Sequence, residues 1–115
     1  MSTPAVLLFS YGSLQNKRVQ LANFGRELKG RPDSLPGYTR RLVPITDQND
    51  KEVTGESHYA NAVPSSNPLD EVAGVVLEIT APEMAAADEY EAPAQYRRIW
   101  VTLRSGIQAW VYVRN

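Results

Sequence analysis

The sequence predicts an α+β fold, a small mixed, mostly antiparallel β-barrel with flanking short helices. Segments with strand and helix patterns follow one another in the order β-α-β-β-loop-β-α-β-β, which differs from the regular strand and helix alternation of a parallel sheet. The last two strand candidates are apolar on both faces, as a barrel-like sheet covered by helices requires. A length of 115 residues suits a single domain over residues 1–115.

Composition excludes several classes of function. The chain is 43% hydrophobic and 22% charged, with a formal net charge of −1, so it lacks the positive field that binding to nucleic acid requires. The apolar run at residues 5–9 is too short to span a membrane, and no basic residues precede it as in a secretory signal. We therefore expect neither nucleic acid nor a membrane as a partner.

The chain contains no cysteine and one histidine, His58. Thiol nucleophiles, zinc sites built on thiolates and sites with two imidazoles are excluded, and the cytoplasm is the expected location. We expect no metal and no cofactor. Any chemistry must come mostly from carboxylates, hydroxyls and backbone groups.

The N-terminal segment predicts a strand, a turn and a helix. Residues 6–9 are an apolar run of strand length that ends at Tyr11-Gly12-Ser13. Spaced apolar side chains over residues 14–24 predict a short amphipathic helix that stops near Gly25.

The middle of the chain predicts extended segments and a long loop. Residues 26–34 are polar and are interpreted as an exposed strand, and the Pro-Gly pair in 35–38 predicts a turn before a second extended segment at 38–45. Residues 46–70 are rich in Asp, Asn, Ser and Pro, so little regular structure is expected there.

The next segment predicts a central strand followed by a capped helix. Residues 72–79 are largely apolar, and Gly74 indicates a bulge or a close backbone approach. Thr80 and Glu83 have the spacing of a capping box, which predicts a helix over 81–90.

Residues 95–103 and 107–113 predict a β-hairpin. Alternation gives it one aliphatic and one aromatic face. The aliphatic face contains Ile99, Val101, Leu103, Ile107, Ala109, Val111 and Val113, and the other contains Tyr96, Arg98, Trp100, Trp110 and Tyr112.

Two regions offer chemistry. The Tyr11 to Leu14 turn joins a strand to a helix, where backbone N–H groups can converge on a carboxylate or an oxyanion, although such turns are more often structural. Asp88 and Glu91 lie three residues apart on one helix face, and we expect Asp88 and the helix dipole to raise the pKa of Glu91 toward the range useful for proton transfer.

The hairpin could supply further site groups. The Tyr96 hydroxyl or an arginine could reach the same place as Glu91, and Arg98 needs an acidic partner such as Asp88 or Glu91 because it lies among aromatic residues. Trp100 and Trp110 could line a pocket, but core packing is the commoner role of large aromatic residues.

Taken in order, these segments resemble the gamma-glutamylcyclotransferase-like family, which includes gamma-glutamylamine cyclotransferases. The resemblance covers almost the whole chain. It rests on Tyr11-Gly12-Ser13-Leu14, Leu35-Pro36-Gly37-Tyr38, Tyr59-Ala60-Asn61-Ala62-Val63-Pro64, Gly74-Val75-Val76, Asp88-Glu89-Tyr90-Glu91, Tyr96-Arg97-Arg98 and Ala109-Trp110-Val111-Tyr112-Val113.

The resemblance implies a cofactor-free enzyme that acts on a small gamma-glutamyl substrate. Glu91 would be the acid–base residue, and the cavity beside Tyr11, Gly12, Ser13 and Leu14 would receive the gamma-glutamyl group, with Tyr96 and Arg98 nearby. The substrate's α-amino group would attack its own γ-carbonyl and release 5-oxoproline.

One departure from the family pattern bears on this reading. The family has glycine after the catalytic glutamate, whereas here Ala92-Pro93 follows, and proline is expected to hold Ala92 in an extended conformation. Two alternatives therefore stay open: a non-catalytic module that binds a small carboxylate ligand in the same cavity, and an interaction domain that uses the 46–70 loop.

Overall fold

The computed structural model describes residues 5–44 and 58–114. These residues form seven strands, two α-helices and two short 3-10 helices. In chain order they are β1 (Val6–Ser10), η1 (Ser13–Gln15), α1 (Lys17–Phe24), β2 (Gly30–Pro36), β3 (Tyr38–Pro44), β4 (His58–Pro64), β5 (Glu71–Ile79), α3 (Ala81–Glu91), η2 (Ala92–Ala94), β6 (Tyr96–Thr102) and β7 (Gln108–Arg114).

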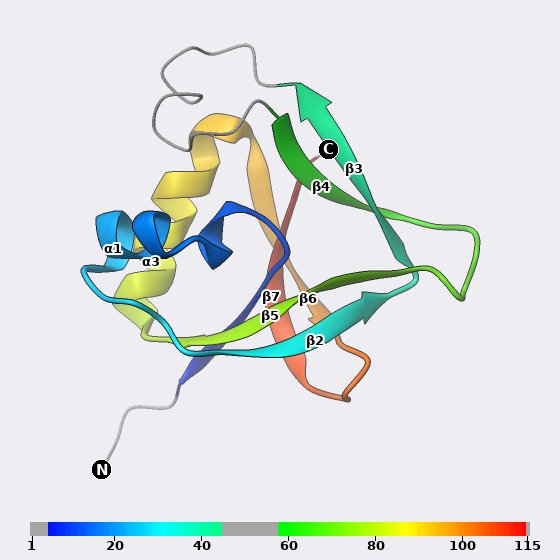
Figure 1. The fold of residues 1–115 in the computed structure, drawn as a ribbon, viewed down its shortest axis with the longest axis horizontal. Coiled ribbons are helices and arrows are strands. Elements are labelled where there is room, and N and C mark those ends of the chain that lie inside the picture. The colour runs from blue at the N-terminus through cyan, green and yellow to red at the C-terminus, as the bar shows by residue number, and fades with distance from the viewer. Residues whose placement is uncertain (1–4, 45–57, 115) are drawn as a thin grey trace.

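The strands form a five-stranded mixed sheet and a two-stranded antiparallel sheet (Figure 1). The larger sheet has the order β2-β5-β1-β7-β6, and its one parallel pair joins β1 to β7. The smaller sheet pairs β3 with β4. The predicted α+β class with a mixed sheet is confirmed. In the described parts of the chain the backbone ladders form these two sheets, and side chains bridge them.

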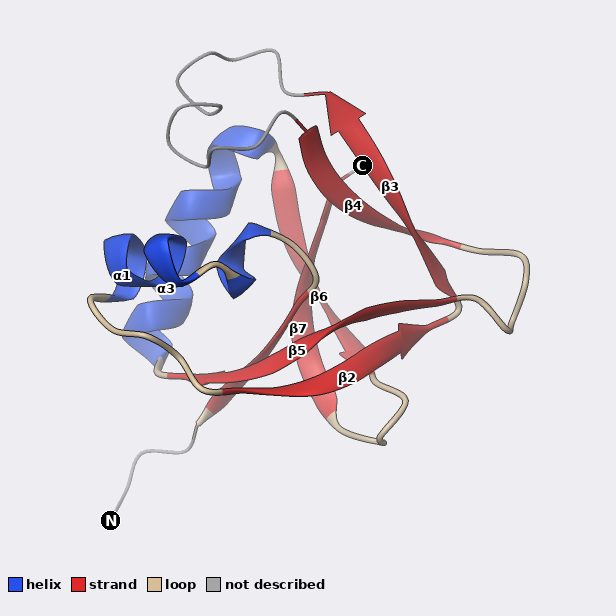
Figure 2. Ribbon diagram, in the orientation of Figure 1, coloured by secondary structure: helices blue, strands red, loops and turns tan. Residues whose placement is uncertain are grey.

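α3 begins and α1 ends where the sequence signals indicate, whereas α1 begins at Lys17, later than the predicted residue 14. The Asn16 side chain caps α1 by accepting a hydrogen bond from the Arg18 N–H, and Gly25 ends the helix with a left-handed backbone at φ 70°. The capping box predicted at Thr80 and Glu83 is present at the start of α3. Figure 2 shows the two helices together on one side of the larger sheet.

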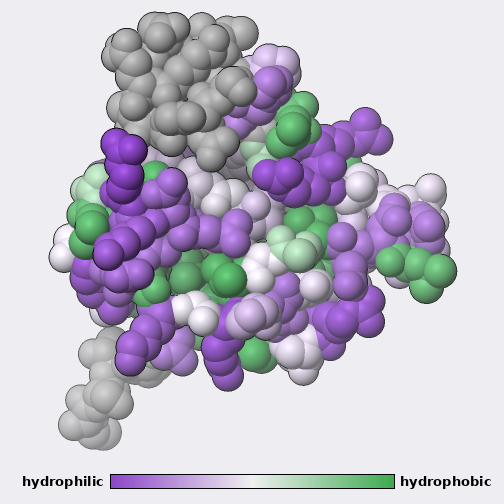
Figure 3. Space-filling view, in the orientation of Figure 1, coloured by the Kyte–Doolittle hydropathy of each residue, from purple (hydrophilic) through white to green (hydrophobic). Residues whose placement is uncertain are grey.

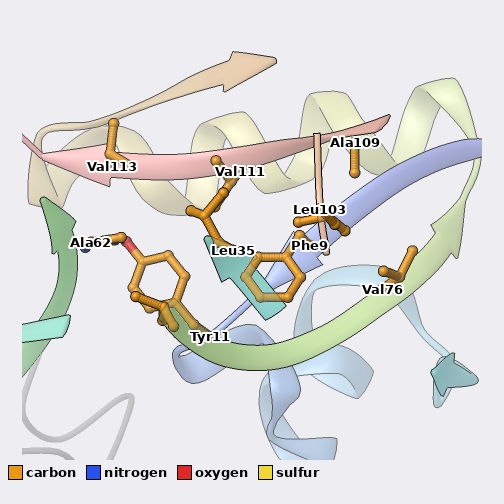
Figure 4. Close-up of a cluster of buried hydrophobic side chains, with 10 residues drawn as sticks. Phe9, Tyr11, Leu35, Ala62, Val76, Leu103, Ala109, Val111 and Val113 are labelled. Carbon is orange, nitrogen blue, oxygen red and sulfur yellow. Dashed lines mark hydrogen bonds between the residues drawn. The ribbon is translucent and has the colours of Figure 1, made fainter. Parts of the chain in front are cut away.

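Two apolar cores lie on opposite faces of the larger sheet. The core under the helices contains Leu8, Leu77, Met84 and Tyr112, whereas the other core contains the aliphatic face of the hairpin. Figure 4 shows part of this second core, with Phe9 from β1 beside residues of β5 and β7. The predicted two-faced hairpin is confirmed, although Trp100 remains 51% exposed at the edge strand β6.

Gly74 is required by a close backbone approach, as expected. A Cβ at this position would lie 2.3 Å from the Ser10 carbonyl oxygen and 2.8 Å from the Phe9 ring. The β2 to β5 register runs through Gly74 without interruption, and the β1 to β5 register ends at Val75, directly beside it, so the strand is regular there. Glycine therefore lets β5 pass directly over the end of β1.

The prediction that residues 46–70 have little regular structure is wrong for residues 58–64, which form β4. This strand includes His58 and Asn61, and its apolar residues besides Tyr59 are small or moderately sized, so its hydrophobic signal is weak. It nevertheless pairs with β3 along its whole length and buries Ala62. The segment 45–57 lies outside the described residues. The predicted strand at 26–34 begins later, at Gly30, and includes Pro32 and Pro36, which an edge strand tolerates.

The face in Figure 3 is mostly hydrophilic, and apolar residues are scattered over it. Among the described helices, none is long and apolar enough to cross a membrane.

Candidate active site

The Tyr11 to Leu14 loop connects β1 to η1 and is fixed by its own carbonyl groups. The carbonyl oxygens of Gly12 and Ser13 accept hydrogen bonds from the backbone N–H groups of Gln15 and Asn16. The Leu14 carbonyl accepts a bond of 2.8 Å from the side chain of Gln20. Because the first N–H groups of a short helix have no intrahelical acceptor, the loop presents donors rather than acceptors.

The Tyr11 side chain points into the protein and joins β4 to β7. Its hydroxyl donates a hydrogen bond of 2.6 Å to the Tyr112 carbonyl oxygen and accepts one of 3.0 Å from the Ala62 N–H. Figure 4 shows the hydroxyl directed at Ala62. The sequence predicted Tyr11 at the substrate; in the structure its ring is buried, and its hydroxyl already has both a donor and an acceptor as partners.

Glu91 is the last residue of α3 and is only 8% exposed. Among the described residues, no hydrogen bond or ion pair involves its carboxyl group. Burial raises the pKa of Glu91 from 4.5 to about 8, because the protein interior disfavours the charged form. The Glu91 carboxyl therefore exchanges its proton in the pH range where an acid–base group is useful.

The direction of the predicted pKa shift agrees with the structure, but the predicted cause does not. We expected Asp88 and the helix dipole to raise the pKa of Glu91, whereas removal from water is the cause. Asp88 is occupied by other partners: its Oδ1 accepts 2.9 Å and 2.7 Å hydrogen bonds from Arg98 Nε and the Tyr112 hydroxyl.

The expected extended conformation of Ala92 is also wrong. Ala92 has φ −56° and ψ −44°, which is helical, so the backbone of α3 continues into η2 despite Pro93. Pro93 lies in the first turn of η2, where a missing N–H removes no hydrogen bond. The Ala92-Pro93 sequence thus leaves Glu91 on a regular last turn of α3.

A direct contact joins the N-terminal loop to the end of α3. The Ser13 Oγ and the Tyr90 hydroxyl are hydrogen bonded at 2.8 Å. The Glu91 carboxylate also lies close enough to the Tyr11 hydroxyl to raise the pKa of that tyrosine, which burial moves to about 12. The structure therefore brings together Tyr11, Ser13 and Glu91, which the sequence predicted as parts of one site.

Tyr96 and Arg98 lie at the same end of the molecule but have partners of their own. The Tyr96 hydroxyl donates to the Ala60 carbonyl oxygen of β4, and a Cβ on Gly12 would lie 3.9 Å from the Ala60 side chain. Tyr96 therefore lies near the Tyr11 to Leu14 loop, with Ala60 of β4 between them. Arg98 pairs with Asp88, one of the two partners predicted for it, and its guanidinium lies 4.5 Å from the Trp110 ring centroid.

Sequence reasoning missed two buried amide side chains that hold the site in place. Gln20 links the Leu14 carbonyl to the Leu28 N–H, with both distances at 2.8 Å. Asn61 bonds the N–H and carbonyl groups of Arg114, and so ties β4 to the end of β7. In the sequence each of these two residues is visible only as a polar residue between apolar neighbours, a pattern that also fits a loop.

The described part of the chain contains no group of three His, Cys, Asp or Glu side chains that could hold a metal ion. The groups gathered around Glu91 are hydroxyls and backbone donors. Such an arrangement suits proton transfer and stabilisation of an oxyanion.

The family model described as gamma-glutamyl cyclotransferase, AIG2-like, matches residues 8–115. The chain belongs to this family. The match includes the Tyr11 to Leu14 loop, both helices and the hairpin, so membership in the gamma-glutamyl cyclotransferase family agrees with the resemblance found in the sequence. No curated protein sequence is significantly similar to the chain.

Solved structures share the fold at low sequence identity. The chain superimposes on an Arabidopsis thaliana protein at a TM-score of 0.75 and 21% identity, covering 98% of this chain and 64% of that one. An uncharacterized Homo sapiens protein gives 0.76 and 24%, covering 98% and 68%. A yeast gamma-glutamyl cyclotransferase described as specific to glutathione gives 0.62 and 14%, covering 96% and 69%. The chain spans less than two thirds of the Arabidopsis protein.

Proposed function

We propose that this protein is a gamma-glutamyl cyclotransferase that releases 5-oxoproline from a small gamma-glutamyl amine or amide. The observation that carries the proposal is the buried Glu91 carboxyl, which has no ionic partner among the described residues and adjoins the Tyr11 to Leu14 loop. Family membership supports the reaction class.

Glu91 acts first as a base. In its ionised form the carboxylate removes a proton from the substrate's α-ammonium group, so the neutral amine can attack the γ-carbonyl carbon of the same molecule. Nucleophile and electrophile belong to one molecule, so the protein needs only to hold the chain of the substrate in a bent conformation. A five-membered ring and a tetrahedral oxyanion form in this step.

The N-terminal loop holds the substrate and stabilises the charge that develops. The backbone N–H groups of Gly12, Ser13 and Leu14 donate to the substrate's α-carboxylate or to the oxyanion, because the carbonyl groups of this loop are already bonded. Glu91 then returns its proton to the departing amine as the carbon–nitrogen bond breaks. The ring nitrogen gives up its second proton to the released amine, so the products are 5-oxoproline and the protonated amine, and Glu91 is again ionised.

The test is release of 5-oxoproline from gamma-glutamyl amines, gamma-glutamyl dipeptides and glutathione. Glu91→Gln should abolish release because it keeps the side-chain shape and removes the transferable proton, a loss of about 100-fold or more. Glu89→Gln is the matched control, since Glu89 is exposed on the same helix.

Equal activity in wild type and Glu91→Gln would refute the role of Glu91. No release by the folded wild-type protein from any substrate, together with binding of 5-oxoproline or glutamate, would instead establish the binding module.

A further inference from the structure

Two carboxylates one helical turn apart on α3 have contrasting surroundings. Asp88 accepts hydrogen bonds from Arg98 and from the Tyr112 hydroxyl. Glu91 is buried and has no such bond among the described residues. Arg98, which is bonded to α3 near its C-terminal end, is therefore paired with the acid that the proposed reaction does not use.

Arg98 is held in this position from two sides. Its Nε lies 2.9 Å from Asp88 Oδ1, and its guanidinium lies over the Trp110 ring. Trp110 is in turn packed against Trp100, with ring centroids 5.0 Å apart. The guanidinium is thus placed between the helix and an aromatic pair, on the side of β6 and β7 that faces α3.

The same cation could otherwise pair with Glu91. Asp88 and Glu91 lie one turn apart on α3, and the charges of Asp88, Glu91 and Arg98 all act on the Tyr112 hydroxyl, so Arg98 and Glu91 are both within electrostatic reach of that group. An arginine bonded to Glu91 would keep that carboxylate ionised and would occupy the oxygen that must accept the substrate's proton.

We propose that Asp88 is a positioning residue that holds Arg98 away from Glu91 and so keeps the Glu91 carboxyl unpaired. The catalytic consequence of this role depends on the proposed cyclotransferase function, whereas the pairing of Arg98 with Asp88 does not. Arg98 then contributes to the site by binding Asp88, and it does not bind the substrate.

Other titratable groups come from the elements packed around the end of α3. Tyr11, which follows β1, and Tyr112 on β7 face the Glu91 carboxyl, and burial raises the pKa of both. Tyr90, on the same helix, bonds Ser13, and the Tyr96 hydroxyl on β6 bonds β4. Arg40 on β3 acts on Tyr11, and the Arg114 guanidinium at the end of β7 lies 5.8 Å from the Tyr96 ring centroid.

The experiment follows the titration of the Glu91 carboxyl by carbon-detected NMR on the full chain labelled with carbon-13 at the glutamate side-chain carboxyl. Glu91→Gln identifies the signal by its loss. In Asp88→Asn, release of Arg98 should lower the pKa of Glu91 by about 1 to 3 units. Glu89→Gln should leave the titration unchanged.

A double variant separates this mechanism from a simple loss of negative charge. In Asp88→Asn/Arg98→Met the pKa of Glu91 should return to the wild-type value, because no arginine remains to pair with it. A pKa that stays low in the double variant would show that the lost charge of Asp88 was responsible, and it would overturn the proposal. An unchanged pKa in folded Asp88→Asn would do the same.

Arg98→Met alone provides a test if Asp88→Asn does not fold. The titration of Glu91 should be unchanged, and a rise of about one unit or more would mean that Arg98 already pairs with Glu91 in wild type, which refutes the proposal. The acidic limb of the rate profile should shift with the pKa in each variant. Because NMR needs no turnover, the expected shifts in an inactive wild type would leave the positioning role intact while the proposed function fails.

Discussion

The burial of Glu91 makes a quantitative prediction about stability. The pKa of this group is about 8 in the folded protein and 4.5 as an ordinary glutamate. The folded state therefore keeps the proton at pH values where the unfolded state has lost it. The stability that depends on this proton is fully present below 4.5 and is lost as the pH rises through about 8.

Glu91→Gln removes this dependence, since glutamine has no proton to lose. At 1.36 kcal/mol per unit, the wild-type penalty is about 1 kcal/mol at pH 5 and about 3 kcal/mol at pH 7. The stability advantage of Glu91→Gln over wild type should therefore grow by about 2 to 3 kcal/mol between these two pH values. A substitution that removes the proposed catalytic group should stabilise the fold.

Urea unfolding of both proteins at pH 5, 6, 7 and 8 measures this difference directly. Comparing the two proteins at each pH cancels the contribution of every other titrating group. Glu89→Gln controls for a change of net charge on α3, and its difference from wild type should stay nearly constant with pH. A constant difference for Glu91→Gln as well would mean that Glu91 is hydrated in the folded protein, and the argument from burial would be refuted.

Three further predictions concern activity and packing. Release of 5-oxoproline should rise about tenfold per pH unit below about 8, because the ionised fraction of Glu91 limits the rate; a flat profile from pH 6 to 8 would contradict this. Asn61→Ala should lower the free energy of unfolding by about 2 kcal/mol in urea titrations, since two backbone groups of β7 lose their partner; an unchanged midpoint would contradict the bridge. Gly74→Ala should cost about 3 kcal/mol or prevent folding, because its Cβ would meet the Ser10 carbonyl oxygen at 2.3 Å, and circular dichroism with thermal melting will test this.

Signals that act over a few residues allowed much of the fold to be predicted. The Thr80 capping box, the Gly25 helix end and the alternating hairpin depend on local geometry, so the sequence displays them directly. β4 was missed because its strand structure comes from pairing with β3 and from the Asn61 bridge to a residue 53 positions later. Contacts of that range leave no periodic pattern in either segment.

In the candidate site, too, features that depend on local spacing could be predicted, and features that depend on long-range packing could not. Proximity of Asp88 and Glu91 on one helix face follows from their spacing, but the two environments follow from what packs against that face. The position of the hairpin relative to α3 decides both environments. It buries Glu91, and it places Arg98 and Tyr112 where they donate hydrogen bonds to Asp88. The pKa shift of Glu91 could therefore be predicted in direction, whereas its cause required the structure.

The parallel pairing of β1 with β7 has a consequence for the order in which the fold can assemble. β1 occupies the middle of the larger sheet, and Leu8 and Phe9 are in register with Trp110 and Val111, about a hundred positions later in the chain. During synthesis one edge of this apolar strand stays unpaired until β7 has left the ribosome. Pairing of such long sequence separation slows folding, and the nascent chain exposes one edge of β1 until β7 arrives.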